Sequence, residues 1–306
     1  MTAHTNTAGT WTLGDLTVNR VGFGAMRLTG RAAFTSTGDG ASRDRSIAVL
    51  RRAVELGVNH IDTAAFYFSP RLSANELINR ALAPYPDDLV ITTKVWPGRD
   101  PSGEWWWATP GQLRGQVEEN LRQLGRDRLD VVNLRVPPSE RTGSIAAHFG
   151  ALADLRDAGL IRHLGVSNVT PAQLAEARGI APVVCVQNPY GVGSPAGQRE
   201  LLRLCGEQGI AFVPFFAIAG AGREAGAGAT SGSTSGSGSG EPEAVLDIAR
   251  DRGVTAAQVR LAWTLGQGAH VLAIPGTGDP AHLEENVAAG ALVLTEDEMK
   301  RLDAIS

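Results

Sequence analysis

Residues 129–168 read LDVVNLRVPPSERTGSIAAHFGALADLRDAGLIRHLGVSN, and this stretch carries the pattern that decides the fold. Two apolar runs rich in β-branched residues, 129–136 and 161–168, enclose the segment 145–160, in which apolar residues recur near i, i+3, i+4 and i+7. Gly159 stands just before the second run, where a glycine is typical of a helix end. The stretch therefore predicts a strand, an amphipathic helix and a second strand parallel to the first.

The same unit repeats along most of the chain. Eight apolar runs are expected to form strands: VGFGAM from Val21, NHIDTA from Asn59, LVITTKV from Leu89, LDVVNLRV from Leu129, IRHLGVSN from Ile161, PVVCVQN from Pro182, IAFVPFF from Ile210 and VLAIPGT from Val271. Further helix-ending glycines are expected at Gly57, Gly125 and Gly209. Eight repeats with strands apolar on both faces favour an α/β fold of the (β/α)8 TIM barrel type, as a single domain over 1–306. A doubly wound open sheet is the alternative, but its usual GxGxxG fingerprint is absent from GFGAMRL, residues 22–28.

Three segments lie outside this repeat. TWTLGDLTV, residues 10–18, predicts a hairpin around Gly14 and Asp15 that could plug the bottom of the barrel. LTEDEMKRLDAIS, residues 294–306, predicts a terminal helix with a capping box between Thr295 and Glu298. The Gly/Ser-rich segment 219–240 has the composition of a flexible loop, an inert expansion more readily than a lid over a ligand.

Composition limits the function classes. The chain has 306 residues, 43% hydrophobic and 20% charged, with a net charge of -4, which is typical of a soluble globular protein and gives no footing for nucleic acid. No window holds the roughly 18 apolar residues of a membrane span, and the N-terminal stretch does not read as a signal peptide. We therefore expect a cytoplasmic protein. Cys185 and Cys205 are expected to be buried thiols rather than a disulfide.

Candidate catalytic residues gather where the second and third predicted strands end. Asp62 and Tyr67 lie in NHIDTAAFY, and Lys94 closes LVITTKV. In a TIM barrel these strand ends meet on the face that carries the active site. A phenol with its ordinary pKa of about 10 is a poor acid at neutral pH, but a neighbouring ammonium favours the phenolate. The trio thus predicts a tyrosine proton donor assisted by an Asp-bound lysine; the alternative is a structural Asp–Lys pair with a tyrosine that only packs.

The sequence resembles the aldo-keto reductase family over essentially its whole length. The phrases that carry the resemblance are GVNHIDTAAFY, ITTKV, HLGVSNVTPAQL and AIPGTGDPAHLEENVAA. LDVVNLRV, SNVTPAQLAEAR, VCVQN and FVPFF make the chain most similar to the family's pyridoxal-reductase-like branch. The resemblance implies hydride transfer from a nicotinamide cofactor to a small-molecule carbonyl compound, with Tyr67 delivering the proton.

The resemblance also implies cofactor roles. Ser167, Asn168 and Gln187 would hold the nicotinamide carboxamide, and Phe215 would cover one face of its ring. The other implied positions are Gly24, Ala25 and Met26 near the first strand, Thr277 and Gly278 opening the eighth helix beside a phosphate, and His282, Glu285 and Asn286 toward the adenosine. Gly276 and His282 stand where the family often has cations for the 2′-phosphate. NADPH is expected on the strength of the branch and the helix terminus, and NADH stays open.

Arg135 stands where the family usually has a histidine. A guanidinium stays charged and can only donate hydrogen bonds, so Arg135 could stabilise negative charge on the substrate oxygen. It could also bind a phenolate, phosphate or carboxylate of the substrate. The alternative is a structural pairing with the Asp62 carboxylate, which would leave a less active site.

Four tryptophans crowd the loop after the third predicted strand. Trp96, Trp105, Trp106 and Trp107 predict an aromatic wall of a substrate pocket, although three consecutive rings cannot all face one way. Three other functions remain alternatives: reduction of an activated C=C bond, a lyase or isomerase step, and a weakly active NADPH-binding regulator. A sugar hydrolase is disfavoured because only one carboxylate is well placed. We expect no metal site.

Overall fold

A curled parallel sheet forms the centre of the computed structural model, which describes residues 5–30, 43–215, 217–218 and 241–305. The expected loop 219–240 lies outside the described residues. Seven strands pair in the order β11-β10-β9-β8-β5-β4-β3. Their bounds are β3 Phe23–Gly24, β4 His60–Asp62, β5 Val90–Val95, β8 Leu129–Arg135, β9 Ile161–Ser167, β10 Val183–Gln187 and β11 Ala211–Phe212.

The eighth apolar run closes the ring. Val271 bridges Phe212 of β11, and Ala273 bridges Val21 just before β3, both in parallel. The backbone N–H of Gly22 donates to the Ala273 carbonyl at 2.8 Å. The run forms bridges rather than a full strand because Pro275 follows at once and has no N–H to extend a ladder. The (β/α)8 TIM barrel is confirmed, and the open-sheet alternative is wrong.

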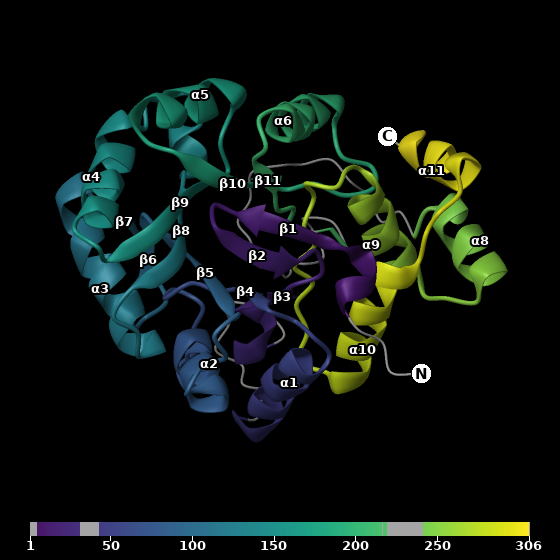
Figure 1. Ribbon diagram of the computed structural model, residues 1–306, viewed down its shortest axis with the longest axis horizontal. Helices are drawn as coiled ribbons and strands as arrows, with labels where there is room; N and C mark the ends of the chain where they lie inside the picture. Colours follow the sequence, from purple (N-terminus) through teal and green to yellow (C-terminus); the bar gives the residue numbers. More distant parts are fainter. Residues whose placement is uncertain (1–4, 31–42, 216, 219–240, 306) are drawn as a thin grey trace.

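Helices surround the sheet (Figure 1). Their bounds are α1 Arg43–Glu55, α2 Ala74–Leu82, α3 Leu113–Leu124, α4 Ala146–Asp157, α5 Pro171–Ile180, α6 Ala196–Glu207, α8 Glu243–Arg252, α9 Ala256–Gly266, α10 Pro280–Ala288 and α11 Glu296–Asp303. The four predicted helix-ending glycines all have positive φ: 88° at Gly57, 62° at Gly125, 82° at Gly159 and 67° at Gly209. Within the described part of the chain, every helix is too short or too polar for a membrane span.

The N-terminal hairpin lies across one end of the ring (Figure 1). It consists of β1 Thr10–Leu13 and β2 Leu16–Asn19, antiparallel around Gly14 and Asp15 as predicted. Leu13 and Val18 are fully buried and join one apolar cluster with barrel residues such as Val90 and Val131. The hairpin therefore seals the end of the barrel opposite the strands' carboxyl ends.

Two smaller predictions are also confirmed. The Thr295 hydroxyl accepts from the Glu298 N–H at 3.3 Å, and Glu298 accepts from the Thr295 N–H at 2.7 Å, so α11 begins with a capping box. Cys185 and Cys205 are buried free thiols. Burial raises the pKa of both to about 12, which keeps them protonated and unreactive.

Candidate active site

A buried ion pair lies at the carboxyl ends of β4 and β5. The Lys94 ammonium donates to both Asp62 oxygens, at 2.6 and 2.7 Å, and to the Thr63 carbonyl at 3.0 Å. Its three N–H groups thus each have an acceptor. Gln187, at the end of β10, donates to Asp62 Oδ2 at 2.7 Å. Asp62 and Lys94 are 3% and 2% exposed, so they are a fully desolvated pair whose attraction offsets desolvation only because the geometry is this good.

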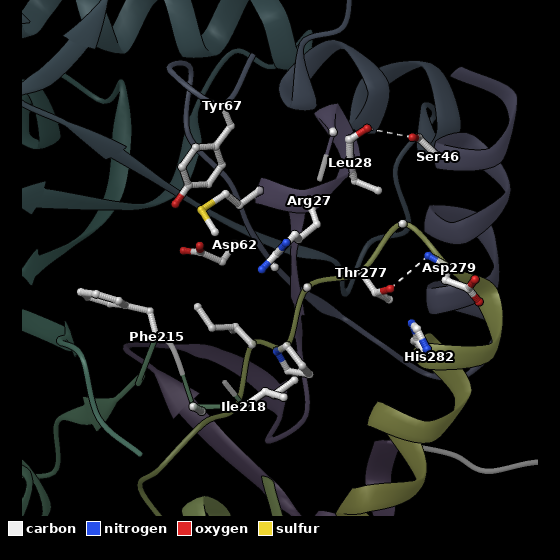
Figure 2. A pocket seen from close by; sticks show the side chains of 18 of the residues that line it. Arg27, Leu28, Ser46, Asp62, Tyr67, Phe215, Ile218, Thr277, Asp279 and His282 are labelled. Carbon is white, nitrogen blue, oxygen red and sulfur yellow. Dashed lines mark hydrogen bonds between the residues drawn. The ribbon is translucent and has the colours of Figure 1, made fainter. Parts of the chain in front are cut away.

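Tyr67 lies directly against this pair. It follows β4 in a turn closed by its own N–H, which donates to the Ala64 carbonyl at 3.0 Å. The Lys94 Nζ is 4.9 Å from the centroid of its ring. Figure 2 shows the Tyr67 hydroxyl on the same side of the pocket as the Asp62 carboxylate. The structure therefore brings together the aspartate, tyrosine and lysine that the sequence placed at these strand ends.

A buried amide network, which was not predicted, holds the two strand ends in register. Thr63, next to the aspartate, donates to Asn75 Oδ1 at 2.8 Å. Thr93, next to the lysine, donates to Asn120 Oδ1 at 2.6 Å, and Asn75 Nδ2 donates to the same oxygen at 3.0 Å. All four side chains are fully buried. Each asparagine comes from a different helix, so only the assembled barrel brings them together.

A cleft of about 560 Å³ opens beside the ion pair (Figure 2). The predicted site residues that line it are Gly24, Met26, Asp62, Tyr67, Arg135, Gln187, Phe215, Thr277, Gly278 and His282. The predicted residues outside its lining are Ala25, Lys94, Trp96, Trp105, Trp106, Trp107, Ser167, Asn168, Glu285 and Asn286; Lys94 lines the neighbouring cavity beside α3 instead. The cleft is large enough for an extended small molecule and has the catalytic candidates at one end.

Two buried polar atoms at that end lack a partner among the described residues: the Ser167 hydroxyl and Gln187 Oε1. Buried polar atoms are usually hydrogen-bonded, so an orphan pair needs an explanation. Asn168 behaves differently, because its Nδ2 already donates to the Val136 carbonyl at 2.9 Å and its φ is 61°. The hydroxyl and the amide oxygen together can donate to and accept from a ligand amide.

The eighth helix begins later than predicted. α10 starts at Pro280, and Asp279 is its N-cap, accepting from the Ala281 N–H at 2.8 Å. The Thr277 hydroxyl in turn accepts from the Asp279 N–H at 3.0 Å. The expectation that Thr277 and Gly278 open this helix was therefore wrong. A carboxylate caps the first turn, and a proline there has no N–H, so the helix terminus offers little to a phosphate.

The cleft contains cations that the sequence reasoning missed. Arg27 lies on the short helix Ala25–Thr29 that follows β3, and Arg45 lies in the first turn of α1. Both line the cleft. Ser46 donates to the Leu28 carbonyl at 2.9 Å and fixes the segment that carries Arg27. Figure 2 shows Arg27 between Asp62 and Thr277. With Arg135, three guanidinium groups face the cleft of a chain with a net charge of -4.

The backbone explains the glycine after Ile-Pro. A Cβ at Gly276 would lie 2.5 Å from the Gly24 carbonyl oxygen, and one at Gly24 would lie 2.6 Å from the Ile274 carbonyl oxygen. Gly24 N–H donates to the Pro275 carbonyl at 3.1 Å across the same contact. The seam where the barrel closes is thus too tight here for a side chain, which is why no cation stands at this position.

Replacing Gly276 by alanine is expected to lower the free energy of unfolding by about 1–3 kcal/mol, the usual cost of forcing extra atoms into a packed site. Urea unfolding measures it. Gly179→Ala in α5 is the matched control, because its new methyl meets nothing within 4 Å; we expect roughly 0.5–1 kcal/mol of stabilisation there. Equal stability of the two variants would contradict the tight seam.

Arg135 ends β8 and does not pair with Asp62, so that alternative is wrong. Asp62 is bonded to Lys94 and Gln187 instead. The Arg135 guanidinium lies 5.0 Å from the centroid of the Phe215 ring. Among the described residues, the guanidinium has this cation–π contact but no hydrogen-bond acceptor and no carboxylate partner.

The tryptophans form a structure of their own. β6 Pro97–Arg99 pairs antiparallel with β7 Trp105–Trp107. Trp105 and Trp107 stack at 6.3 Å on one face of β7, while Trp106 covers Gly98 on the other. Trp96 is buried and stacks on His148 at 3.8 Å. Trp106 lines a second cavity of about 490 Å³ beside α3, so the predicted aromatic wall does not face the main cleft.

Known proteins share this architecture. The Aldo/keto reductase family model matches residues 20–306. Pyridoxine 4-dehydrogenase of Escherichia coli (strain K12) is 44% identical to the chain, covering 98% of it and 99% of that protein. An uncharacterized oxidoreductase of Schizosaccharomyces pombe is 36% identical, covering 97% and 89%. The solved structure of an aldo/keto reductase from Klebsiella pneumoniae, in complex with NADP and acetate, is 26% identical with a TM-score of 0.72, covering 94% of this chain and 91% of that one.

Proposed function

The chain belongs to the aldo/keto reductase family, and from that premise we propose that it reduces an aldehyde or ketone with NADPH, Tyr67 giving the proton to the carbonyl oxygen. The observation that carries this proposal is the desolvated Lys94–Asp62 pair beneath a tyrosine in the wall of the cleft. A purely structural ion pair in the core would require neither a neighbouring tyrosine nor a cleft open to solvent.

The side chains divide the proton chemistry between them. Tyr67 donates its phenolic proton to the oxygen as negative charge develops there. The Lys94 ammonium, 4.9 Å from the ring centroid, stabilises the phenolate that is left. Asp62 accepts two of the ammonium's hydrogen bonds and so holds it in place. Because Lys94 is almost fully buried, this stabilisation acts in a low-dielectric site.

The residues present fit a nicotinamide cofactor. Bound NADPH would supply the hydride. Gln187 in the cleft wall, and Ser167 beside it in register on β9 but outside the lining, each have a buried polar atom without a partner among the described residues, which suits the carboxamide's donors and acceptors. Phe215 presents an aromatic ring in the same lining. Ala25, Asn168, Glu285 and Asn286 lie behind this lining and would act through the backbone or through neighbours.

Arg27 and Arg45 support NADPH as the cofactor. They place two guanidinium groups along the cleft, where phosphates would need cations, and they replace the cations that Gly276 and His282 do not supply. Structural relatives bind this cofactor: besides the NADP complex, another Klebsiella pneumoniae structure, 26% identical, is a complex with NADPH.

Replacing Arg27 by methionine is expected to raise the Kd for NADPH by about 10- to 100-fold, the effect of losing a hydrogen bond to a charged group. Titration of tryptophan fluorescence with NADPH measures it. The titration is repeated with NADH. If Arg27 contacts the diphosphate, which both cofactors have, the variant should bind both more weakly. If it contacts the 2′-phosphate, only NADPH binding should weaken. Arg114→Met removes an exposed guanidinium of α3 and is the control. An unchanged Kd would remove Arg27 from the cofactor site.

Turnover with a panel of aldehydes, ketones and pyridoxal tests the proposed function. Pyridoxal is included because pyridoxine 4-dehydrogenase is 44% identical. We expect NADPH consumption with formation of the alcohol, identified by mass and NMR. Products saturated at a C=C bond, or rearranged without NADPH consumption, would instead support the C=C reductase or the isomerase. Binding of NADPH without turnover of any compound would support a regulator.

A further inference from the structure

Among the described residues, nothing supplies a counter-charge to the Arg135 guanidinium. Arg135 is partly buried in the wall of the cleft, and no hydrogen bond or ion pair joins its guanidinium to any described residue. Other partly buried arginines of the chain do have acceptors: Arg20 donates to four carbonyls, and Arg260 pairs with Glu241. A guanidinium cannot shed its charge and carries five donors, so leaving it unpaired in a partly dry site is costly.

The Arg135 side chain lines the cleft next to the Phe215 ring. The guanidinium carbon lies over that ring, 5.0 Å from its centroid, and the ring offers a cation–π contact but no hydrogen-bond acceptor. The N–H groups lie in the guanidinium plane, where a carboxylate or phenolate oxygen binds best. Nearby Asp62 is already occupied by Lys94 and Gln187, so it does not serve as the counter-ion.

The position of Arg135 tells where such an anion would sit. Arg135 pairs in register with Ser167 of the neighbouring strand, whose hydroxyl is one of the two orphan polar atoms. It shares the catalytic end of the cleft with Tyr67 and Gln187. A negative group that reaches Arg135 must therefore be near the carbonyl that Tyr67 protonates.

We propose that Arg135 selects carbonyl substrates that carry an oxyanion next to the carbonyl group. Two kinds of compound present this chemistry: 2-oxo carboxylates, and aromatic aldehydes with an ortho phenolate. The inference rests on the proposed reductase function and adds its substrate class. It also gives the position a role that a neutral imidazole does not fill, since the guanidinium keeps its positive charge at every physiological pH.

Matched substrate pairs test the proposal with NADPH at saturation. The phenolate arm compares 2-hydroxybenzaldehyde with benzaldehyde, and 4-hydroxybenzaldehyde moves the same oxygen away from the carbonyl. The carboxylate arm compares phenylglyoxylate with its methyl ester. The wild-type protein is expected to favour the anionic member of at least one pair by about 10- to 100-fold in kcat/KM. 4-Hydroxybenzaldehyde is expected to show a much smaller increase in kcat/KM over benzaldehyde.

Three variants assign the preference to the residue. In Arg135→Met, the ratio of kcat/KM for the anionic member to kcat/KM for the neutral member of each pair is expected to fall to about one, mostly because KM for the anionic member rises. Arg135→Lys keeps the charge but not the planar fork, and is expected to retain part of the ratio. Arg135→His is expected to broaden the range toward neutral carbonyls. NADPH titration serves as the folding control, because Arg135→Met is expected to bind the cofactor as the wild type does.

The outcomes separate this inference from the function on which it rests. Equal kcat/KM within both pairs in the wild type, or a preference that survives in Arg135→Met, would overturn the role of Arg135 while carbonyl reduction stood. Failure of the wild type to oxidise NADPH with any carbonyl compound, neutral or anionic, would instead remove the proposed function itself.

Discussion

Tyr67→Phe is expected to lower kcat for carbonyl reduction by about 10²- to 10⁴-fold, the usual contribution of a positioned general acid. The substitution removes the hydroxyl and keeps the ring. The ring packs edge-on against Phe66 at 5.1 Å and lies 4.9 Å from Lys94 Nζ, so the apolar packing and the cation–π contact both survive. NADPH affinity should therefore stay close to that of the wild type.

Single-turnover oxidation of bound NADPH, followed by its absorbance, isolates the chemical step from product release. Tyr85→Phe is the matched control. The Tyr85 hydroxyl lies outside the cleft, where it donates to the Leu124 carbonyl at a distance of 2.6 Å. That control is expected to lose about 1 kcal/mol of stability and no activity. Equal single-turnover rates in wild type and Tyr67→Phe would remove the tyrosine from the mechanism.

Lys94→Met is expected to lower the free energy of unfolding by about 3–5 kcal/mol, because it leaves the Asp62 carboxylate buried with only Gln187 as a side-chain partner. Activity should fall as well, since nothing then stabilises the phenolate. Urea unfolding followed by fluorescence measures the first effect. The double variant Asp62→Asn with Lys94→Met removes both charges, and we expect it to recover stability but not turnover.

Arg122→Met breaks an exposed pair with Glu119 and is the control for ion pairs in general. Because that pair is solvated, its loss should cost less than about 1 kcal/mol. A Lys94→Met variant no less stable than this control, or a double variant as unstable as Lys94→Met alone, would contradict the description of Lys94 and Asp62 as a desolvated, mutually dependent pair.

The predictable parts of this molecule are those encoded locally. Gly57, Gly125 and Gly159 end helices because of their own backbone freedom, and the strands are short apolar runs. Asp62 and Tyr67 are five residues apart in one strand and turn, so their proximity needs little more than the correct fold class. Lys94 follows because adjacent parallel strands end at the same edge.

Features that several helices and strands build together could not be predicted from the sequence. Arg27 faces the cleft because Ser46 of a different helix holds its segment, a contact without a sequence signature. The Asn75–Asn120 bond joins two helices. The start of α10 was predicted too early, because Thr277 and Asp279 are both residue types that cap helices. In the structure Asp279 is the cap, since it accepts from the Ala281 N–H. The tryptophans of β7 do not line the main cleft. Strand alternation places Trp106 over Gly98 of β6 and in the cavity beside α3, and leaves Trp105 and Trp107 stacked on the other face.

We propose that the protein transfers hydride from NADPH to a carbonyl carbon while Tyr67 protonates the oxygen. Deuterium transfer tests this hydride step. Two preparations of NADPH, each deuterated at C4 in one of the two epimeric positions, are reacted with the carbonyl compound that has the highest turnover. NMR and mass spectrometry of the alcohol should show one deuterium on the carbinol carbon from one of the two epimers. An alcohol without deuterium from either epimer, or label at a carbon that was part of a C=C bond, would contradict the account.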